Sequence, residues 1–181
     1  QDISVTVNAV NDNQPVITSN GGGETATIDV AENSTAVTTV TATDADLPAQ
    51  DLDYTISGGA DAARFDIAAA SGELTFAASP NFEAATDSGS NNTYEVIVRV
   101  SDGISFFDLQ TITVSVTDVD EFDVSPISDA DGGADSVNEN ASDGVSVGIR
   151  ASATDDDGTS NTVTYSLDND SNGEFFIETS A

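Results

Sequence analysis

The sequence contains no cysteine, histidine, methionine or tryptophan. Without cysteine, a disulfide framework and thiol chemistry are excluded. Without histidine, the chain lacks the usual general base and the commonest ligand of transition metals, so zinc, copper and haem are not expected as cofactors. The oxygen donors that remain, which are carboxylates, amides and backbone carbonyls, are the ligands that calcium prefers.

Basic residues are nearly absent. Arg64, Arg99 and Arg150 stand against 33 acidic residues, which gives a formal net charge of −30. Nucleic acid is excluded as a partner because binding a polyphosphate requires a basic face. Ion pairs within the chain can neutralise only a few carboxylates, so the others must be solvated, spread apart or bound to cations.

Long apolar runs are missing as well. No stretch is long enough to span a bilayer, and the chain starts at Gln1 without a methionine or a signal-like leader. We therefore expect a segment from the interior of a longer secreted protein, with no insertion into membranes.

Alternation of apolar and polar residues indicates half-buried β-strands. In the clearest strand, Tyr94, Val96 and Val98 face one way, while Glu95 and Arg99 face the other. Glycine-rich turns separate such segments, and no sustained helical stripe occurs. Short strands with frequent turns predict an all-β sandwich. The predicted strands are residues 27–30, 36–42, 52–56, 94–100 and 111–116.

The sequence repeats itself with an offset of about 110 residues, a normal length for one sandwich domain. Short patterns recur in the same order along the chain: residues 3–7 as 112–116, 30–33 as 137–140, 42–46 as 153–157, 54–57 as 165–168, and 65–67 as 175–177.

This repetition predicts the domain boundaries. A complete repeat at residues 16–118 is preceded by a linker at 10–15 and by the last strand of an earlier repeat at 1–9. A second linker at 119–125 leads into a second repeat at 126–181.

The second repeat is expected to be truncated, because it stops before its three closing strands. Those strands supply much of the inner face, so we expect the continuing chain or another chain to complete the core. The strands predicted in this part are residues 136–137, 145–153, 163–167 and 175–177.

Acidic motifs lie at strand ends or in linkers rather than on an alternating face. Together they resemble the cadherin family, and more closely its bacterial relatives in giant surface proteins. The resemblance covers nearly the whole chain. It implies tandem seven-stranded Greek-key β-sandwich repeats that bind calcium at their junctions. The motifs are Asn11-Asp12-Asn13-Gln14-Pro15, Glu32-Asn33, Asp44-Ala45-Asp46, Asn81-Phe82-Glu83, Ser101-Asp102-Gly103 and, more distantly, Asp118-Val119-Asp120-Glu121-Phe122.

Carried over residue by residue, the resemblance implies one complete calcium site at the upstream junction. Asp12 would serve further sites there, whose other ligands lie before Gln1. The implied ligands of the complete site are Asn11, the Asn13 carbonyl, Asp44, Asp46 and Asp102.

At the junction between the two repeats, the resemblance implies paired inner sites and a third site. Glu121 replaces the usual aspartate, and Phe122 replaces an asparagine that normally offers its carbonyl, so two ions are expected rather than three. The inner sites would use Glu32, Glu83, Asp118, Glu121 and Asp157, with Asn81 as a neutral donor. The third would use Asp120, Asp155 and Asp157.

Independent physical reasoning favours the same interpretation. Carboxylates that are distant in sequence can converge at one end of a sandwich, and there they repel each other strongly. A hard cation with six to eight oxygen ligands removes that repulsion and fixes the linker.

Other interpretations of the acidic residues are weaker. Carboxylate pairs occur in glycosidases, but the chain has no tryptophan to stack a sugar, and the acids lie where linkers need them. Residues 168–173 match the first half of an EF-hand loop. Because the twelfth position is Thr179 and the flanks are strand-like, a turn is expected instead.

We therefore predict a non-enzymatic, extracellular, calcium-binding structural or adhesive repeat that rigidifies a long cell-surface protein. Its expected partners are neighbouring repeats of the same or another copy, and a cell-surface protein or glycan. Two alternatives stay open. One is a carbohydrate-binding module, with Phe106 and Phe107 as its aromatic platform. The other is a subunit of an extracellular filament assembled by strand complementation.

Overall fold

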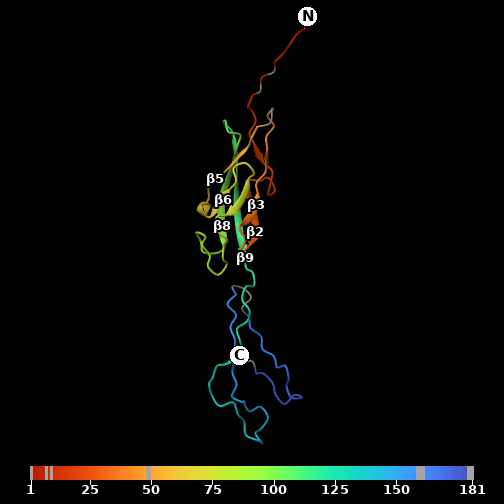
Figure 1. The fold of residues 1–181 in the computed structure, drawn as a ribbon, viewed down its shortest axis with the longest axis vertical. Coiled ribbons are helices and arrows are strands. Elements are labelled where there is room, and N and C mark those ends of the chain that lie inside the picture. Colours follow the sequence, from red (N-terminus) through yellow and green to blue (C-terminus); the bar gives the residue numbers. More distant parts are fainter. Residues whose placement is uncertain (1, 7, 9, 48–49, 158–161, 179–181) are drawn as a thin grey trace. The chain divides into compact units, whose positions relative to one another are not determined.

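The computed structural model describes residues 2–6, 8, 10–47, 50–157 and 162–178. The chain divides into two compact units, Gln1–Val119 (unit 1) and Asp120–Ala181 (unit 2). Strands and one short 3-10 helix make up the regular structure of the described residues (Figure 1). No helix among them is long and apolar enough to cross a bilayer.

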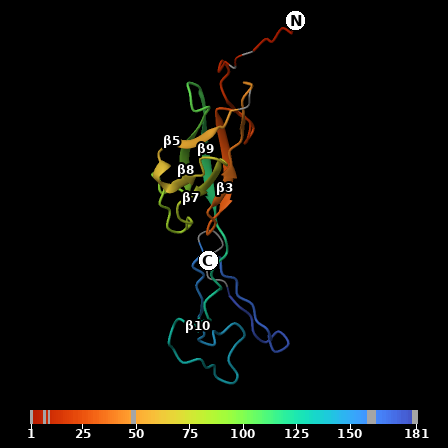
Figure 2. The same ribbon diagram turned by 45° about the horizontal axis from the view of Figure 1, so that its top comes forward.

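Unit 1 is a β-sandwich of two layers, so the predicted all-β fold is confirmed (Figures 1 and 2). One layer has the strand order β2-β9-β8-β5, and the other has the order β3-β7-β6. The strands are β1 Val16–Ile17, β2 Thr25–Ala31, β3 Ala36–Thr39, β4 Ala42–Thr43, β5 Asp53–Gly58, β6 Phe65–Ile67, β7 Glu73–Phe76, β8 Thr93–Ser101 and β9 Phe107–Thr117, with the 3-10 helix η1 at Ala62–Arg64.

Alternation in β8 and β9 buries one side of each strand against the opposite layer. Tyr94, Val96 and Val98 on β8 are buried, whereas Glu95 between them is exposed, as the sequence predicts. The rings of Phe65, Phe76 and Tyr94 pack together, with Phe65 and Phe76 stacked at 4.7 Å between centroids. Such aromatic packing adds to the free energy gained by removing apolar area from water.

The first strand of the sandwich is divided between the two layers. β1 pairs antiparallel with β4, and after a short loop β2 pairs in parallel with β9. Gln110, fully buried on β9, holds this loop, because its Nε2 donates to the Gly23 carbonyl (2.8 Å) and its Oε1 accepts from the Asn20 amide (3.3 Å). A buried amide with both ends bonded fixes the crossover without an unpaired polar group.

Two predicted strands differ in extent from the observed ones. The strand predicted at 36–42 is interrupted at Val40 and Thr41, although the Val40 amide still donates to the Gly72 carbonyl (2.8 Å). The strand predicted at 111–116 belongs to the longer β9, which begins at Phe107 because β8 pairs with it as far as Ser101. Sequence alternation alone does not show where a partner strand ends.

Unit 2 has much less regular structure than the sequence predicts. Its described strands are β10 Ser128–Asp129 and β11 Ala151–Ser152, which pair antiparallel. The strands predicted at 136–137, 163–167 and 175–177 are not formed, and of 145–153 only β11 is. The apolar side chains of Val137, Leu167 and Phe176 are exposed. A strand needs a hydrogen-bonded neighbour as well as an alternating sequence.

Residues 2–6 form no strand, and Ile3 is 86% exposed, while its repeat counterpart Ile112 is fully buried in β9. Residues 1, 7 and 9 of the strand predicted at 1–9 lie outside the described residues. The assignment of this segment to an earlier repeat stays a prediction.

Gly72 provides a test of how the turn before β7 packs against Val40 and Tyr54. It has a φ of +71°, and an added Cβ would overlap the Val40 carbonyl and approach the Tyr54 ring to 3.1 Å. We expect Gly72→Ala to lower the free energy of unfolding by more than about 3 kcal/mol. The measurement is urea denaturation followed by circular dichroism in a calcium-containing buffer.

The matched control is Gly21→Ala. Gly21 also has a positive φ, of +85°, but nothing lies within 4 Å of its added Cβ. Gly21→Ala should lower the free energy of unfolding only by the backbone strain that a positive φ imposes on alanine, about 1–2 kcal/mol. Equal losses for the two variants would show that the contacts at Gly72 do not hold this turn.

Candidate metal centre

Three loops of unit 1 bring five predicted ligands together at one end of its sandwich. The segment before β1 supplies the asparagines, the loop after β4 supplies two aspartates, and the loop after β8 supplies the last one. We name this group the upstream cluster. It consists of Asn11, Asn13, Asp44, Asp46 and Asp102.

Asp46 anchors the segment before β1. Its carboxylate is 4% exposed and accepts the Asn13 side-chain amide at 2.6 Å, the Asn13 backbone N–H at 3.2 Å and the Asp12 backbone N–H at 3.4 Å. The bond from the Asn13 side chain is the main reason that the pKa of Asp46 lies below its usual value, against the opposing effect of burial. The Asp44 carboxylate in turn accepts the Asp46 backbone N–H at 2.9 Å.

Asp102 organises the turn between β8 and β9 in the same manner. Its Oδ1 accepts the backbone N–H groups of Ile104, Ser105 and Phe106 at 2.8–3.2 Å, and its Oδ2 accepts the Asn11 amide at 3.0 Å. Burial by itself raises the pKa of Asp102, but these donors outweigh it and hold the pKa below its ordinary value. The carboxylate therefore stays charged at neutral pH while it is nearly inaccessible to water.

Two oxygens of the upstream cluster are buried without a donor. Asn11 Oδ1 and Asp44 Oδ2 have no hydrogen-bond partner among the described residues. A buried polar oxygen without a partner loses the free energy of its hydration. Because the three carboxylates around them already repel one another, the group that these oxygens fit is a cation.

The opposite end of unit 1 holds a second set of predicted ligands. Glu32 is buried, and its two oxygens accept the Phe82 N–H (2.7 Å) and the Val119 N–H (3.0 Å). A carboxylate oxygen of Glu83 lies within 4.8 Å of one from Glu32. Asp118 follows β9 and is half-buried.

The oxygen of Asn81, predicted as a neutral donor to the metal, already has a hydrogen-bond partner. Asn81 Oδ1 accepts the Ala84 backbone N–H at 2.6 Å, so this oxygen closes a local turn. The residue is exposed. Its place among the ligands stays a proposal, and the second lone pair of the oxygen is the one that would face an ion.

Asp12, predicted to serve further upstream sites, is exposed, and its Oδ1 accepts the Asn13 side-chain amide at 3.1 Å. The other predicted ligands lie in unit 2. Asp157 is buried, and its Oδ1 accepts the Glu121 and Phe122 N–H groups, both at 3.1 Å. Its pKa lies below the usual value, because these donors and a hydrogen bond with Asp120 outweigh the opposing effect of burial. The same hydrogen bond and repulsion from Asp157 raise the pKa of Asp120, with a smaller contribution from Asp155.

The two units share one hydrogen-bonding arrangement. In unit 1, two successive linker amides donate to Asp46, whose own amide donates to Asp44. In unit 2, the amides of residues 121 and 122 donate to Asp157, whose own amide donates to Asp155 (3.4 Å). The sequence repeat is thus reproduced in the geometry of its acids. The difference is Phe122, which cannot make the side-chain bond that Asn13 makes.

Sequence reasoning missed Gln50, which contacts the upstream cluster. Its Nε2 donates to Asp46 Oδ2 at 3.3 Å, and its Oε1 is buried without a hydrogen-bond partner among the described residues. The only feature of the sequence that points to Gln50 is its position four residues after Asp46, and Gln50 belongs to no motif.

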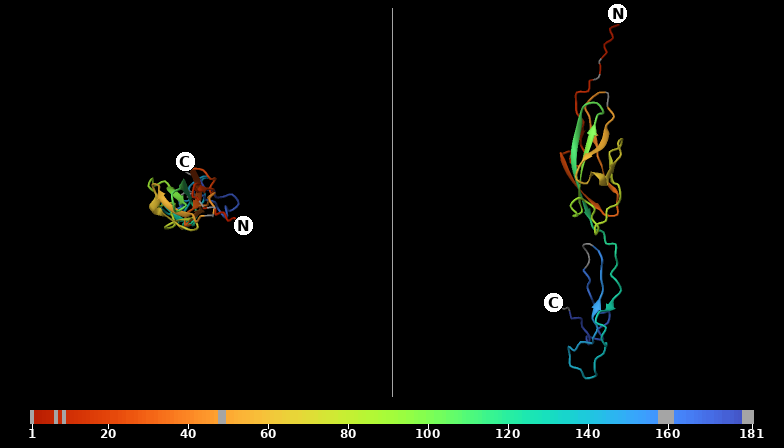
Figure 3. Two further views of the ribbon diagram at one scale, coloured as in Figure 1. Left: turned by 90° about the horizontal axis from the view of Figure 1, so that it is seen from above. Right: turned by 90° about the vertical axis from the view of Figure 1, so that its left-hand side faces the viewer.

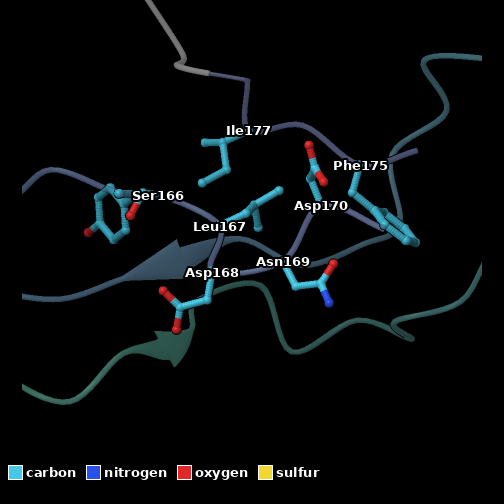
Figure 4. A pocket seen from close by; sticks show the side chains of 8 residues that line it. Ser166, Leu167, Asp168, Asn169, Asp170, Phe175 and Ile177 are labelled. Carbon is cyan, nitrogen blue, oxygen red and sulfur yellow. The ribbon is translucent and has the colours of Figure 1, made fainter. Parts of the chain in front are cut away.

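Other acidic and apolar features lie apart from these clusters. Carboxylates of Asp129, Asp131 and Asp135 approach within 4.8 Å of one another, but all three residues are exposed. A cavity of about 530 Å³ in unit 2 is lined by residues 165–170, Phe175 and Ile177. Leu167 and Ile177 face this space, whereas the Asp168 carboxylate points away from it (Figure 4).

The segment that resembles half an EF-hand loop forms a turn. Residues 171–174 are in turn conformation, and the amides of Glu174 and Phe175 donate to the Asp170 carbonyl. No α-helix flanks it in the described residues, so the expected turn is confirmed. Thr179 lies outside them.

The predicted aromatic platform is partly covered. Phe107 is exposed on β9, but the guanidinium of Arg99 lies 4.7 Å from its ring centroid. This contact is a cation–π interaction. Phe106 is half-buried and belongs to the turn that Asp102 organises.

Comparison with known proteins gives both a family and a fold. A cadherin domain model matches residues 26–119, which is just over half of the chain. No curated protein matches the sequence significantly. Cadherin domains 3–6 of protocadherin gamma B2 match with a TM-score of 0.56 and 21% identity, covering 83% of this chain and 37% of that structure.

Two other solved structures are similar. Drosophila N-cadherin EC1-4 matches with a TM-score of 0.56 and 24% identity, covering 80% of this chain and 34% of that one. The extracellular domain of protocadherin gamma B4 matches with a TM-score of 0.53 and 22% identity, covering 83% of this chain and 22% of that one.

The chain therefore spans only about a fifth to two fifths of these ectodomain structures. At such identities the likeness shows the fold alone. The family rests on the domain model, which covers all strands of the sandwich from β2 to β9. On this ground, the chain belongs to the cadherin family.

Proposed function

We propose that the chain is a calcium-binding module of an extracellular protein, in which bound ions fix the linker segments onto the sandwich. The observation that carries the proposal is the upstream cluster. Three buried or half-buried carboxylates converge there with Asn11 and Asn13, and two oxygens of the cluster find no donor among the residues that the structure describes. A set made only of carboxylate and amide oxygens suits calcium.

Asn11 and Asn13 give this site its mechanical role. Both lie in the segment before β1, whereas the aspartates belong to loops after β4 and β8. A bound calcium ion would supply positive charge that cancels the repulsion between the aspartates. The two asparagines, bound to the same ion as the aspartates, would then be fixed on unit 1. The segment before β1 would become rigid.

Glu32 and Glu83 support a second site at the other end of unit 1, to which Asp118 would contribute. The four predicted ligands of unit 2, which are Asp120, Glu121, Asp155 and Asp157, are proposed to complete the sites of that junction. A side-chain hydrogen bond with Asp157 and repulsion from its carboxylate raise the pKa of Asp120. Calcium would favour the doubly charged form.

Cadherin domains are extracellular and non-enzymatic, so the expectation that this chain is not an enzyme is confirmed by its family. We propose cell-surface adhesion as the wider role, with the chain acting as a repeat of a long, bacterial-type surface protein. Neighbouring repeats are the partners that this role requires.

A filament subunit is the second candidate, because residues 3–7 repeat the core pattern of β9. Ile3 and Val5 are exposed, whereas Ile112 and Val114 are fully buried. The carbohydrate-binding alternative has weaker support, since Arg99 lies over the Phe107 ring.

Calcium should stabilise the chain, and magnesium should do so weakly. With a Kd of about 10⁻⁴–10⁻³ M, each independent site adds about 1.4–2.7 kcal/mol at about 10 mM calcium. Magnesium demands a near-octahedral site and gives up its water reluctantly. The measurement is thermal unfolding with calcium, with magnesium and with excess chelator. A melting curve that is the same with and without excess chelator would contradict the proposal.

Glu83 should matter more to calcium binding than Asp170. Glu83 lies beside Glu32, whereas Asp170 belongs to an exposed turn of unit 2. Both are exposed acids, so the alanine variants remove the same charge. Calorimetric titration should show one site weakened or lost in Glu83→Ala and none in Asp170→Ala. The reverse result would contradict the assignment of ligands.

A further inference from the structure

We infer that Gln50 is a further oxygen ligand of the upstream cluster and offers its Oε1 to the bound cation. The inference rests on the proposed function, because it adds a residue to the same site. None of the motifs that suggested the site includes Gln50. Its evidence is structural: the side-chain amide contacts Asp46, and its buried oxygen has no hydrogen-bond partner in the part of the chain that the structure describes.

The position of the amide places its oxygen at the cluster. Gln50 Nε2 lies 3.3 Å from Asp46 Oδ2, and Oε1 is attached to the same carbon as Nε2. The Asp46 carboxylate accepts from the backbone and side-chain amides of Asn13, and the Asp46 backbone N–H donates to the Asp44 carboxylate, so the Asp46 side chain has a fixed location. The carboxamide of Gln50 is therefore held within a few ångströms of the oxygens that would bind the ion.

The chemistry of the amide then decides which end faces a cation. Without a cation, the NH₂ group is the better neighbour for a carboxylate, and this is the arrangement observed. A cation on Asp46 repels the NH₂ group and attracts Oε1. Rotation of the amide about its last side-chain bond exchanges the two ends at little cost, since that torsion is broad and two-fold.

The ligand count also has room for this oxygen. Calcium takes six to eight oxygens. The cluster offers Asn11, Asp44, Asp46 and Asp102 by their side chains, and Asn13 by its carbonyl. Gln50 adds an oxygen without adding a fourth negative charge, which would otherwise increase the repulsion within the cation-free cluster.

The experiment follows the side-chain carbonyl carbons of the full chain by NMR. The sequence has four glutamines, Gln1, Gln14, Gln50 and Gln110, so ¹³C labelling of the glutamine side-chain carbonyl gives a readily assigned spectrum. Calcium should shift the Gln50 signal. The Gln110 signal should stay in place, because that amide is buried in the sandwich and bonded at both ends.

Substitution supplies the second readout. Gln50→Leu should weaken one calcium site about tenfold, and with terbium it should add about one water to the metal's inner shell. Gln50→Glu should keep the site, since it keeps an oxygen at the same reach. Gln14→Leu is the control, because Gln14 is exposed in the linker at 10–15 and contacts no residue of the upstream cluster in the hydrogen bonds of the described residues.

The outcomes separate the inference from the function on which it rests. An unmoved Gln50 signal in calcium-saturated protein, or unchanged affinity and hydration in Gln50→Leu, overturns the inference while calcium binding stands. A weaker site with unchanged hydration also overturns it, since Gln50 would then only position Asp46. If neither the wild-type chain nor Asp46→Ala responds to calcium, the proposed function itself fails.

Discussion

Repulsion among carboxylates that the chain cannot neutralise is the constraint on which the rest of the structure depends. With three arginines and 33 acids, the chain gathers several acids in loops and linkers and binds them to backbone N–H groups. These donors lower the cost of burying a charge without supplying a positive one. The loops are thereby shaped in advance, and the remaining oxygens are left for a cation.

The same hydrogen-bonding arrangement occurs twice, and its main-chain part does not depend on the linker side chains. In both units the second aspartate of an Asp-x-Asp motif receives two successive linker amides, and these are backbone groups that any residue supplies. Phe122 can therefore stand where unit 1 has Asn13 without loss of the main-chain arrangement. What it loses is the additional side-chain amide, which in unit 1 is the main cause of the lowered pKa of Asp46.

The sequence predicted the sandwich well where one strand could be judged by itself. The alternation from Tyr94 to Val100 showed its buried face directly. It could not predict the division of the first strand between layers, because two residues of β1 carry too little pattern and the crossover depends on distant Gln110. In unit 2 the alternation around Tyr165 was present, yet no strand formed there, because pairing is a property of two segments.

The candidate site shows the same limit. The sequence motifs identified the acidic ligands, since an aspartate at the end of a predicted strand can be recognised from the sequence. They did not show that the Asn81 oxygen closes its own turn, nor that Gln50 reaches Asp46. Both facts depend on loop conformation, which is set by contacts between segments far apart in the chain.

The parallel pairing of β2 with β9 has a consequence for how unit 1 resists force. The two strands pair over seven positions, from Thr25 with Thr111 to Ala31 with Thr117. The chain enters the pair at the start of β2 and leaves it at the end of β9 (Figure 3). Tension between these two points slides the strands past each other along their length. Their hydrogen bonds are loaded in shear and must yield together, whereas a hairpin pulled apart from one end would open one bond at a time.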